Sequence, residues 1–392
     1  MCRYTFNPFL KQNPDWTGKS FDFLRNSDMF EFHKSLEGYE ATPLVSLPKI
    51  ADTLGIKAVL VKDESFRFGI NAFKALGASY AIYRFLKDRW EGQFAAPFNE
   101  RSFSDPAVLE KLGSFTFCAA TDGNHGRAVA WTAKKLKQSA VIFMPSDTVQ
   151  ARIDSIRSEG AEVLIIDGTF DDCVRTAGQQ AKEKGWFEIA DTAYEGYMTI
   201  PSWVLNGYST LFREMENEIN LNEGPQIDFV FLQAGVGAFA AAGASYYTQR
   251  YGKHRPKLIC AEPLEAAGFL DSIDFGEGSP IAAKGKMETI MAGLNCGIPS
   301  LAAWPILKDS IELFLAISDD YAEDAMRQFA ASGVISGEAG ASGLAALLAL
   351  MKDPALADAR KKIGIGEHSR VLLVSTEGDT DPENYQKIVR ND

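Results

Sequence analysis

The chain has 392 residues, of which 46% are hydrophobic, and its formal net charge is −12. This length is enough for one large or two medium domains with a sizeable core. The negative charge argues against a nucleic acid or an anionic membrane surface as partner. No apolar run approaches the roughly 20 residues of a membrane span.

The N-terminus and the cysteines indicate where such a chain works. The first 20 residues contain no apolar stretch typical of a secretory signal. The five cysteines are scattered without a C-x-x-C pair, which argues against a disulfide scaffold. The four histidines show no H-x-x-H or H-E-x-x-H spacing. We therefore expect a cytoplasmic protein with no dedicated metal site.

Apolar strand-like runs alternate with helical ones along the chain. The runs are rich in Val, Ile, Leu and Phe and nearly continuous, as expected of strands covered on both faces. The candidate strands are 57–64, 114–120, 140–145, 161–167, 186–191, 227–233, 257–263, 311–318 and 370–376. Two helices with an apolar stripe, 148–160 and 170–185, each end at glycine. This alternation predicts an α/β protein with mostly parallel sheets, in which ligands bind beyond the carboxyl ends of the strands.

The first candidate site residue in chain order is Lys74, in the run NAFKALGA (71–78). Asn71 as N-cap would place Lys74 in the first turn of a helix. The positive end of the helix disfavours an ammonium there, which helps to make the amine nucleophilic. A lysine on a helix usually faces solvent, but the small and apolar neighbours of Lys74 argue for a buried site.

The loop TDGNHG (121–126) follows the strand at 114–120 and carries the carboxylate of Asp122 at its mouth. Two interpretations are open: Asp122 caps the helix that begins near Asn124, or it takes part in chemistry. Asp191, at the end of a later strand, offers a second carboxylate for the same pocket, with a purely structural role as its alternative.

The run QAGVGAFAAAG (233–243) follows a strand and opens a small-residue helix. Its glycines allow a tight turn, and a helix N-terminus attracts an anion such as phosphate. The simpler interpretation is a turn into a closely packed helix. A rival function also exists: Gly235, Gly237 and Ala240 fit G-x-G-x-x-A, and Glu262 follows about 20 residues later, as in an NAD-dependent oxidoreductase. That rival leaves the other motifs unexplained.

Together, the NAFK, GNHG and Gly-rich motifs resemble the fold-type II pyridoxal-phosphate enzymes, the tryptophan-synthase-β and threonine-dehydratase group. The resemblance spans nearly the whole chain. It implies two α/β domains, each with a mostly parallel twisted sheet and the cofactor in the cleft between them. Residues 1–83 and 209–392 would form the large cofactor-binding domain, and 84–208 a small inserted one.

The same resemblance implies roles for individual residues toward pyridoxal 5'-phosphate. Lys74 would hold the cofactor as a Schiff base, and Asn124 would meet its ring hydroxyl. Ser375 or Thr376 would face the ring nitrogen. The phosphate would be bound by four consecutive residues, Gly235, Val236, Gly237 and Ala238. His125 is expected to pack or hydrogen-bond beside the cofactor. Glu338 would lie near the ring or line the pocket, and it has no assigned role.

Two departures from the broad group narrow the resemblance. Many members have Ser-Phe-Lys where this chain has Ala72-Phe73-Lys74, and many have a small residue at the position of Asp122. With KDESFRFGINAFK, DTAYEGY, IMAGLNCG, SGEAGASG and STEGDTD, these segments resemble the 2,3-diaminopropionate ammonia-lyase family. The resemblance implies α,β-elimination of 2,3-diaminopropionate to pyruvate and two ammonia, with a serine or threonine dehydratase as alternative. Fold-type II relatives are commonly dimers, so a homodimer is expected by analogy.

The chemistry of this elimination gives Asp122 a purpose. A β-amine departs well only as ammonia, so it must be protonated, and a nearby carboxylate favours the ammonium. Serine and threonine carry a neutral hydroxyl and would leave Asp122 without a cationic partner. We therefore interpret Asp122, with Asp191 as a second carboxylate, as the selector for a diamino acid. Lys74 would remove the α-proton from one face, and Asp122 could serve as base on the other.

Overall fold

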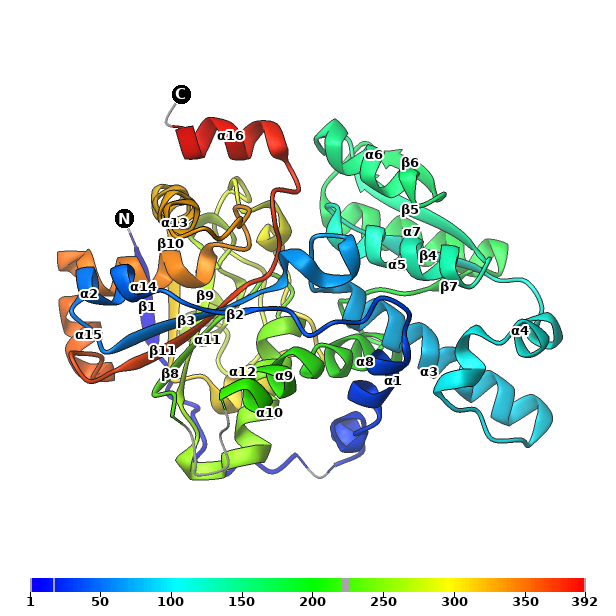
Figure 1. The fold of residues 1–392 in the computed structure, drawn as a ribbon, viewed down its shortest axis with the longest axis horizontal. Coiled ribbons are helices and arrows are strands. Elements are labelled where there is room, and N and C mark those ends of the chain that lie inside the picture. Colours follow the sequence, from blue (N-terminus) through cyan, green and yellow to red (C-terminus); the bar gives the residue numbers. More distant parts are fainter. Residues whose placement is uncertain (1, 17, 220–225, 391–392) are drawn as a thin grey trace. The chain divides into compact units, whose positions relative to one another are not determined.

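The computed structural model describes residues 2–16, 18–219 and 226–390. They form two compact units, each with its own sheet (Figure 1). The larger unit contains the chain up to Phe21, Ala41–Ala72 and the chain from Leu211 onward. The smaller unit contains Asp22–Glu40 and Phe73–Thr210.

These units differ from the domain limits predicted from the sequence. The prediction assigns 1–83 and 209–392 to one domain and 84–208 to the other, whereas residues 22–40 and 73–83 lie in the smaller unit. A compact unit need not coincide with a domain that folds alone, so the predicted limits stay a prediction.

The larger unit is built around a seven-stranded sheet whose five inner strands are parallel and whose two edge strands run antiparallel. The order across the sheet is β1 (Arg3–Phe6), β10 (Leu313–Ile317), β9 (Lys257–Pro263), β8 (Phe229–Gln233), β11 (Arg370–Ser375), β3 (Ala58–Asp63) and β2 (Leu44–Ser46). The sequence predicted all five inner strands. It missed β1 and β2 because they are short and half-exposed, and so lack a continuous apolar run.

The core of the larger unit lies between this sheet and its helices. Helix α14 (Ser342–Lys352) is buried at every position from Ser342 to Leu350, and it packs against β8 and β11. A helix that is apolar all round fits only a fully covered position.

The smaller unit has a four-stranded parallel sheet. The order is β6 (Glu162–Ile166), β5 (Ser139–Pro145), β4 (Thr116–Ala120) and β7 (Phe187–Glu188). The two predicted helices are confirmed as α6 (Gln150–Ser158) and α7 (Phe170–Lys184). The predicted α/β class with mostly parallel sheets is thus confirmed in both units.

The strand orders locate where each sheet can bind a ligand. In the smaller unit the chain leaves β4 toward β5 on one side, and β7 returns to the other side of β4. In the larger unit β9 and β11 flank β8 in the same way. Ligands in open α/β sheets bind at the carboxyl ends of strands where the order reverses. These points are followed by residues 121–126 and 189–191 in one unit, and by 234–238 and 376–378 in the other.

Helix α3 (Lys74–Phe94) packs closely against α8 (Thr199–Gly207) within the smaller unit (Figure 1). Glycines make the close approach possible. A Cβ on Gly77 would lie 2.4 Å from Cε1 of Tyr208 and 2.7 Å from Cγ1 of Val204. A Cβ on Gly207 would lie 2.5 Å from the backbone oxygen of Leu76. The first turn of α3 is therefore fixed against the end of α8.

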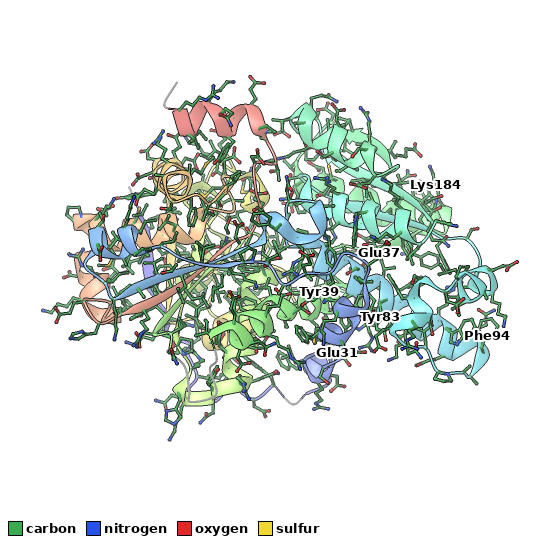
Figure 2. The ribbon with its side chains drawn as sticks, viewed as in Figure 1. Glu31, Glu37, Tyr39, Tyr83, Phe94 and Lys184 are labelled. Atoms are coloured by element: carbon green, nitrogen blue, oxygen red, sulfur yellow. The ribbon has the colours of Figure 1, made fainter. Side chains whose placement is uncertain are left out.

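Helix α3 also packs against α1 (Met29–Ser35), which belongs to the smaller unit as well. Figure 2 labels Glu31 on α1 and Tyr83 on α3. The ring of Tyr83 stacks on Phe32 with ring centres 4.3 Å apart. This aromatic contact stabilises the middle of α3 against α1.

The predicted N-cap Asn71 is wrong. Helix α3 begins at Lys74 with Phe73 in the N-cap position, and Asn71 has a left-handed φ of 57°. The backbone oxygen of Asn71 accepts a hydrogen bond from the N–H of Gly378 at 2.9 Å, and Ala72 pairs with Glu377. Asparagine tolerates the left-handed region, which explains its presence here without a cap. The expected position of Lys74 in the first turn is confirmed.

The segment before Asn71 is anchored by a buried ionic cluster in the larger unit. Arg67 donates to both carboxylate oxygens of Glu64 at 2.8–2.9 Å and to both oxygens of Glu214 at 2.8–2.9 Å. Lys62 lies 2.9 Å from Glu214, and all four side chains are at most 1% exposed. Burial alone would raise the pKa of Glu214, but the charges of Arg67 and Lys62 lower it to about 2. The paired charges offset the cost of their burial.

We predict that Gly77→Ala destabilises the chain, because the added methyl group overlaps the ring of Tyr208. Such overpacking costs about 1–3 kcal/mol, which should appear as a lower thermal unfolding midpoint. Gly92→Ala is the matched control on the same helix, since a Cβ there meets nothing within 4 Å. That variant should gain about 0.5–1 kcal/mol. Equal midpoints for the two variants would contradict the close packing of α3 on α8.

Candidate active site

Lys74 is the first residue of α3, and its amine contacts a carboxylate of the same unit. Its Nζ donates to Oδ2 of Asp191 at 2.5 Å, and the two side chains are 17% and 7% exposed. The rings of Phe73 and Tyr208 lie 5.5 and 6.0 Å from Nζ, measured to the ring centres. The expected burial of the lysine site is thus confirmed, and a carboxylate partner is added to it.

Asp191 follows β7 at the carboxyl edge of the smaller sheet. Burial would raise its pKa, but the charge and hydrogen bond of Lys74, with a smaller effect of His125, lower the pKa of Asp191 to about 2. Asp191 is therefore ionised at every physiological pH. It can hold a protonated Lys74 in place, but it cannot take its proton.

Asp122 lies between β4 and helix α5 (Asn124–Lys135). Burial raises the pKa of Asp122 to about 7; the charges of Asp191 and Asp147 add to the rise, and Arg152 and Lys74 oppose it. A carboxyl group with this pKa exists in both protonation states near neutral pH. Asp122 and Asp191 therefore differ in chemistry although both lie in the same unit.

The loop around Asp122 owes its hydrogen bonds to a residue that sequence reasoning missed. The Oγ1 of Thr121 accepts from the N–H of Gly123 at 2.9 Å and from that of Gly126 at 3.1 Å. Gly123 occupies the N-cap of α5 and offers no side chain, and Asn124 is the first helical residue. Thr121 thus caps the start of α5, the role that the alternative interpretation gave to Asp122. A threonine directly after a strand and before a helix was the available signal.

His125 is buried beside the same loop. Its Nε2 lies 2.6 Å from the backbone oxygen of Ile189, so Nε2 carries the proton, because a carbonyl oxygen only accepts. Burial lowers the pKa of His125, which favours the neutral ring. Its Nδ1 lies 3.9 Å from Oδ2 of Asp191 and has no hydrogen-bond partner among the described residues. His125 thus hydrogen-bonds the backbone, and its expected place beside the cofactor stays a prediction.

In the larger unit, residues 235–238 form the turn between β8 and α10 (Ala238–Tyr251). Gly237 has φ 92°, and a Cβ there would lie 2.3 Å from Cζ of Phe269. A Cβ on Gly235 would lie 3.0 Å from the Cα of Leu294. The turn therefore requires glycine at 237 and leaves little room for a side chain at 235, and the N-terminus of α10 follows it directly. No acidic side chain occurs in 234–240, so the turn suits a phosphate group.

Ser375 and Thr376 follow at the end of β11 in the same unit. The Oγ of Ser375 donates to Oγ of Ser336 at 2.8 Å, and both side chains are buried. The Oγ1 of Thr376 accepts from Nε2 of Gln233 at 3.2 Å. Both hydroxyl groups are neutral hydrogen-bond partners, as the predicted role beside a ring nitrogen requires.

Gln233, the last residue of β8, joins these two segments and was missed in the sequence. Its Nε2 also lies 2.9 Å from the backbone oxygen of Val374 and 3.3 Å from that of Gly340. One amide thus ties the end of β8 to the end of β11. A polar residue closing an otherwise apolar strand was the signal for it.

The loop SGEAG (336–340) packs on the chain after β11. Cβ atoms on Gly337 and Gly340 would lie 2.5 and 2.6 Å from the backbone oxygens of Gly378 and Glu377. Glu338 is buried, and its Oε1 accepts from Nδ2 of Asn384 at 2.6 Å. These contacts give Glu338 a visible role in anchoring the C-terminal helix α16 (Pro382–Arg390).

The predicted site residues thus form two groups, one in each unit. The group in the smaller unit lies at the start of α3 and after the ends of β4 and β7, and it contains Lys74, Asp122, Asn124 and Asp191. The glycine turn, Ser375 and Thr376 follow β8 and β11 in the larger one. In the described part of the chain, no group of His, Cys, Asp and Glu side chains could hold a metal ion. None of the helices in the described ranges is long and apolar enough to cross a membrane.

Comparison with known proteins finds similar chains and structures. A sequence family described as pyridoxal-phosphate dependent enzyme matches residues 36–377. Diaminopropionate ammonia-lyase of Salmonella typhimurium is 38% identical over 100% of this chain and 98% of its own. The protein of that name from Escherichia coli K12 is 40% identical over 92% of this chain and 89% of its own. A crystal structure of the Escherichia coli enzyme, in complex with an aminoacrylate-PLP azomethine reaction intermediate, has a TM-score of 0.86 at 36% identity, covering 100% of this chain and 97% of that one.

The nicotinamide alternative is wrong. The matching family uses a different cofactor. The carboxylate of Glu262 is fully buried and accepts from the N–H groups of Phe269 and Leu270 at 2.7 and 2.8 Å. Glu262 therefore caps helix α11 (Gly268–Phe275) and cannot bind a ribose.

We predict that the stability of the cofactor-free chain depends on the protonation of Asp122. An unfolded aspartate has a pKa of about 3.9, and in the folded chain the pKa of Asp122 is about 7. The folded state binds the proton more tightly between these values. The contribution of Asp122 to the free energy of unfolding is therefore fully present below about pH 4 and lost as the pH rises through about 7.

Asp122→Asn removes this titration. The free energy of unfolding of the variant, relative to that of the unmodified chain, should rise by about 2 kcal/mol from pH 5 to pH 8. The unfolding midpoints of both proteins are measured at the two pH values, and their difference is compared. The exposed Asp320→Asn is the control and should show no such change. A constant difference for Asp122→Asn would show that burial does not raise the pKa of Asp122.

Proposed function

The chain belongs to the pyridoxal-phosphate dependent enzymes, and within them to the diaminopropionate ammonia-lyases, and from this premise we propose the residues that carry its reaction. The reaction is the α,β-elimination that converts 2,3-diaminopropionate to pyruvate and two ammonia. The observation that carries the proposal is the pair of unlike carboxylates in the smaller unit. Asp191 is ionised and binds Lys74 at 2.5 Å, whereas the pKa of Asp122 is about 7.

The residues fit pyridoxal 5'-phosphate. Lys74 offers the amine for the covalent link, and residues 235–238 offer a glycine turn at a helix N-terminus for the phosphate. Asn124 is proposed to meet the ring hydroxyl, and Ser375 or Thr376 the ring nitrogen. When bound, the cofactor supplies an electron sink that makes the α-proton of the substrate acidic.

Lys74 is proposed to remove the α-proton with its Nζ. The proton makes Nζ an ammonium, and the ionised Oδ2 of Asp191 stabilises this charge at hydrogen-bond distance. Because the pKa of Asp191 is about 2, the proton stays on Nζ and is not passed to the carboxylate. Asp191 therefore orients the base and supports its charged form.

Asp122 is proposed to select the substrate. Its carboxylate binds the β-ammonium of a diamino acid, and this positive charge in turn favours the ionised carboxylate. The C–N bond can then break with ammonia as leaving group. A hydroxy acid brings no such charge and leaves a half-buried carboxylate without a partner, which costs binding free energy. This argument separates the chain from the serine and threonine dehydratases.

Asp122 is also proposed as the base for the second enantiomer. A carboxyl group with a pKa near 7 is well matched to proton transfer at neutral pH. Lys74 and Asp122 would then abstract protons from opposite faces of the substrate, and the enzyme would accept both enantiomers.

The setting of the enzyme is proposed more coarsely. All five cysteines are free and buried, in keeping with the cytoplasm. A homodimer is proposed by analogy with fold-type II relatives.

We predict that Lys74→Ala abolishes the covalent link to the cofactor. Purified variant and unmodified protein are each incubated with pyridoxal 5'-phosphate, reduced with borohydride and weighed by mass spectrometry. The unmodified protein should retain one cofactor and the variant none. Lys87→Ala, on the same helix, should behave like the unmodified protein. A reduced adduct in Lys74→Ala would place the link on another amine.

We predict that Asp122→Asn impairs the reaction more than cofactor binding. Pyruvate release is measured with D- and L-2,3-diaminopropionate beside L-serine and L-threonine. The unmodified enzyme should turn over the diamino acids far faster than the hydroxy acids. In Asp122→Asn the kcat for one enantiomer should fall by about 10²–10⁴, the usual contribution of a general base.

Asp147→Asn is the control for Asp122, because Asp147 is an exposed carboxylate near it. It should keep most of the activity. If Asp122→Asn lowers cofactor affinity and turnover of both enantiomers equally, Asp122 is a structural residue of the loop.

A further inference from the structure

Tyr208 lies directly after α8 with its ring held in one place. Its side chain is fully buried, and its ring centre is 4.5 Å from that of Phe73, the residue before Lys74. The missing Cβ of Gly77 leaves the space that the ring occupies. Rotation of this ring would collide with α3, so the position of its hydroxyl group is fixed.

The hydroxyl group of Tyr208 has no hydrogen-bond partner among the described residues. Buried hydroxyl groups are nearly always satisfied, and an exception calls for a function or an absent partner. A buried polar group left without a hydrogen bond typically costs about 1–3 kcal/mol of stability. The hydroxyl group of Tyr208 is therefore expected to serve the function of the site and not the packing.

The amine of Lys74 is a candidate partner for this hydroxyl group, since its Nζ lies 6.0 Å from the Tyr208 ring centre. Burial raises the pKa of the Tyr208 phenol, the charge of Lys74 opposes this, and the charge of Asp191 adds to it. The phenol therefore stays protonated at working pH. It can form hydrogen bonds, but it does not serve as a base.

We propose that Tyr208 is a positioning residue for Lys74, whose hydroxyl oxygen accepts one N–H of the amine while Oδ2 of Asp191 accepts another. The inference rests on the proposed role of Lys74 as base. A neutral amine has two N–H groups and one lone pair. With both N–H groups held by fixed acceptors, the lone pair has a single direction left, toward the substrate.

The proton balance of the step is simple. The Cα–H bond of the substrate breaks, its electron pair stays on the substrate, and the proton forms a third N–H bond on Nζ. The ammonium that results keeps its bonds to Asp191 and Tyr208, so no side chain must move during the transfer. Pre-alignment of this kind lowers a barrier without new contacts to the substrate.

Tyr208→Phe tests the proposal, because it removes the oxygen and keeps the ring. We expect kcat for diaminopropionate to fall by about tenfold, the effect of losing one hydrogen bond to a charged group, with KM unchanged. The isotope effect with α-deuterated substrate should increase, because proton abstraction becomes slower. Formation of the covalent adduct between the cofactor-free protein and pyridoxal 5'-phosphate, followed by absorbance, should slow as well.

A structural role predicts a different pattern. The thermal unfolding midpoint of Tyr208→Phe should not fall appreciably, since the only partner proposed for the lost hydroxyl group is the amine of Lys74, which keeps its bond to Asp191. Tyr83→Phe is the matched control: Tyr83 is 1% exposed and lies on α3 (Figure 2). It should leave kcat, the isotope effect and adduct formation unchanged.

Three results would overturn the inference. The first is unchanged kcat and adduct formation in Tyr208→Phe. The second is an equal loss in Tyr83→Phe. The third is a large drop in the unfolding midpoint, or loss of folding, which would show that the hydroxyl group has a structural partner. Failure of the proposed function itself is recognised separately, because Lys74→Ala would then still form the reduced adduct.

Discussion

The contact between Lys74 and Asp191 is the interaction on which the proposed chemistry of the smaller unit depends. It joins the first residue of α3 to the chain after β7, two positions 117 residues apart. The glycines of α3 and α8 fix one end, and the hydrogen bond from His125 to Ile189 supports the other. A lysine so close to the positive end of a helix needs a fixed anion, and the strand order of the sheet supplies one.

The two carboxylates show how different surroundings give the same side chain different pKa values. Asp191 has a cation at contact distance, and its pKa falls to about 2 despite burial. For Asp122 burial outweighs the opposing charges of Arg152 and Lys74, and its pKa rises to about 7. Separation of pKa values within one site is the usual way in which a protein obtains distinct acid and base roles from the same side chain.

Much of this was predictable from the sequence, and the rest was not for physical reasons. The inner strands, the helices after β5 and β6, and the lysine in a first turn follow from periodicity and continuous apolar runs. Local pattern could not reveal β1 and β2, which owe their existence to the strands beside them. Asn71 was misread because a left-handed residue and an N-cap favour the same side chain. Gln233 and Tyr208 matter through partners distant in sequence, which a single chain does not display. Thr121 bonds the nearby Gly123 and Gly126, and its place between a strand and a helix could have revealed it.

The four-residue ionic cluster of Lys62, Glu64, Arg67 and Glu214 bears on how this sequence can change over time. Two cations and two carboxylates balance in a place that water does not reach. Loss of any one leaves an unpaired charge, which is far more damaging than loss of all four. Descendants of this chain can therefore leave the arrangement only through joint replacement by apolar residues of similar volume. Single substitutions in the cluster are therefore strongly disfavoured, and the sequence of the segment before Lys74 is conserved as a consequence.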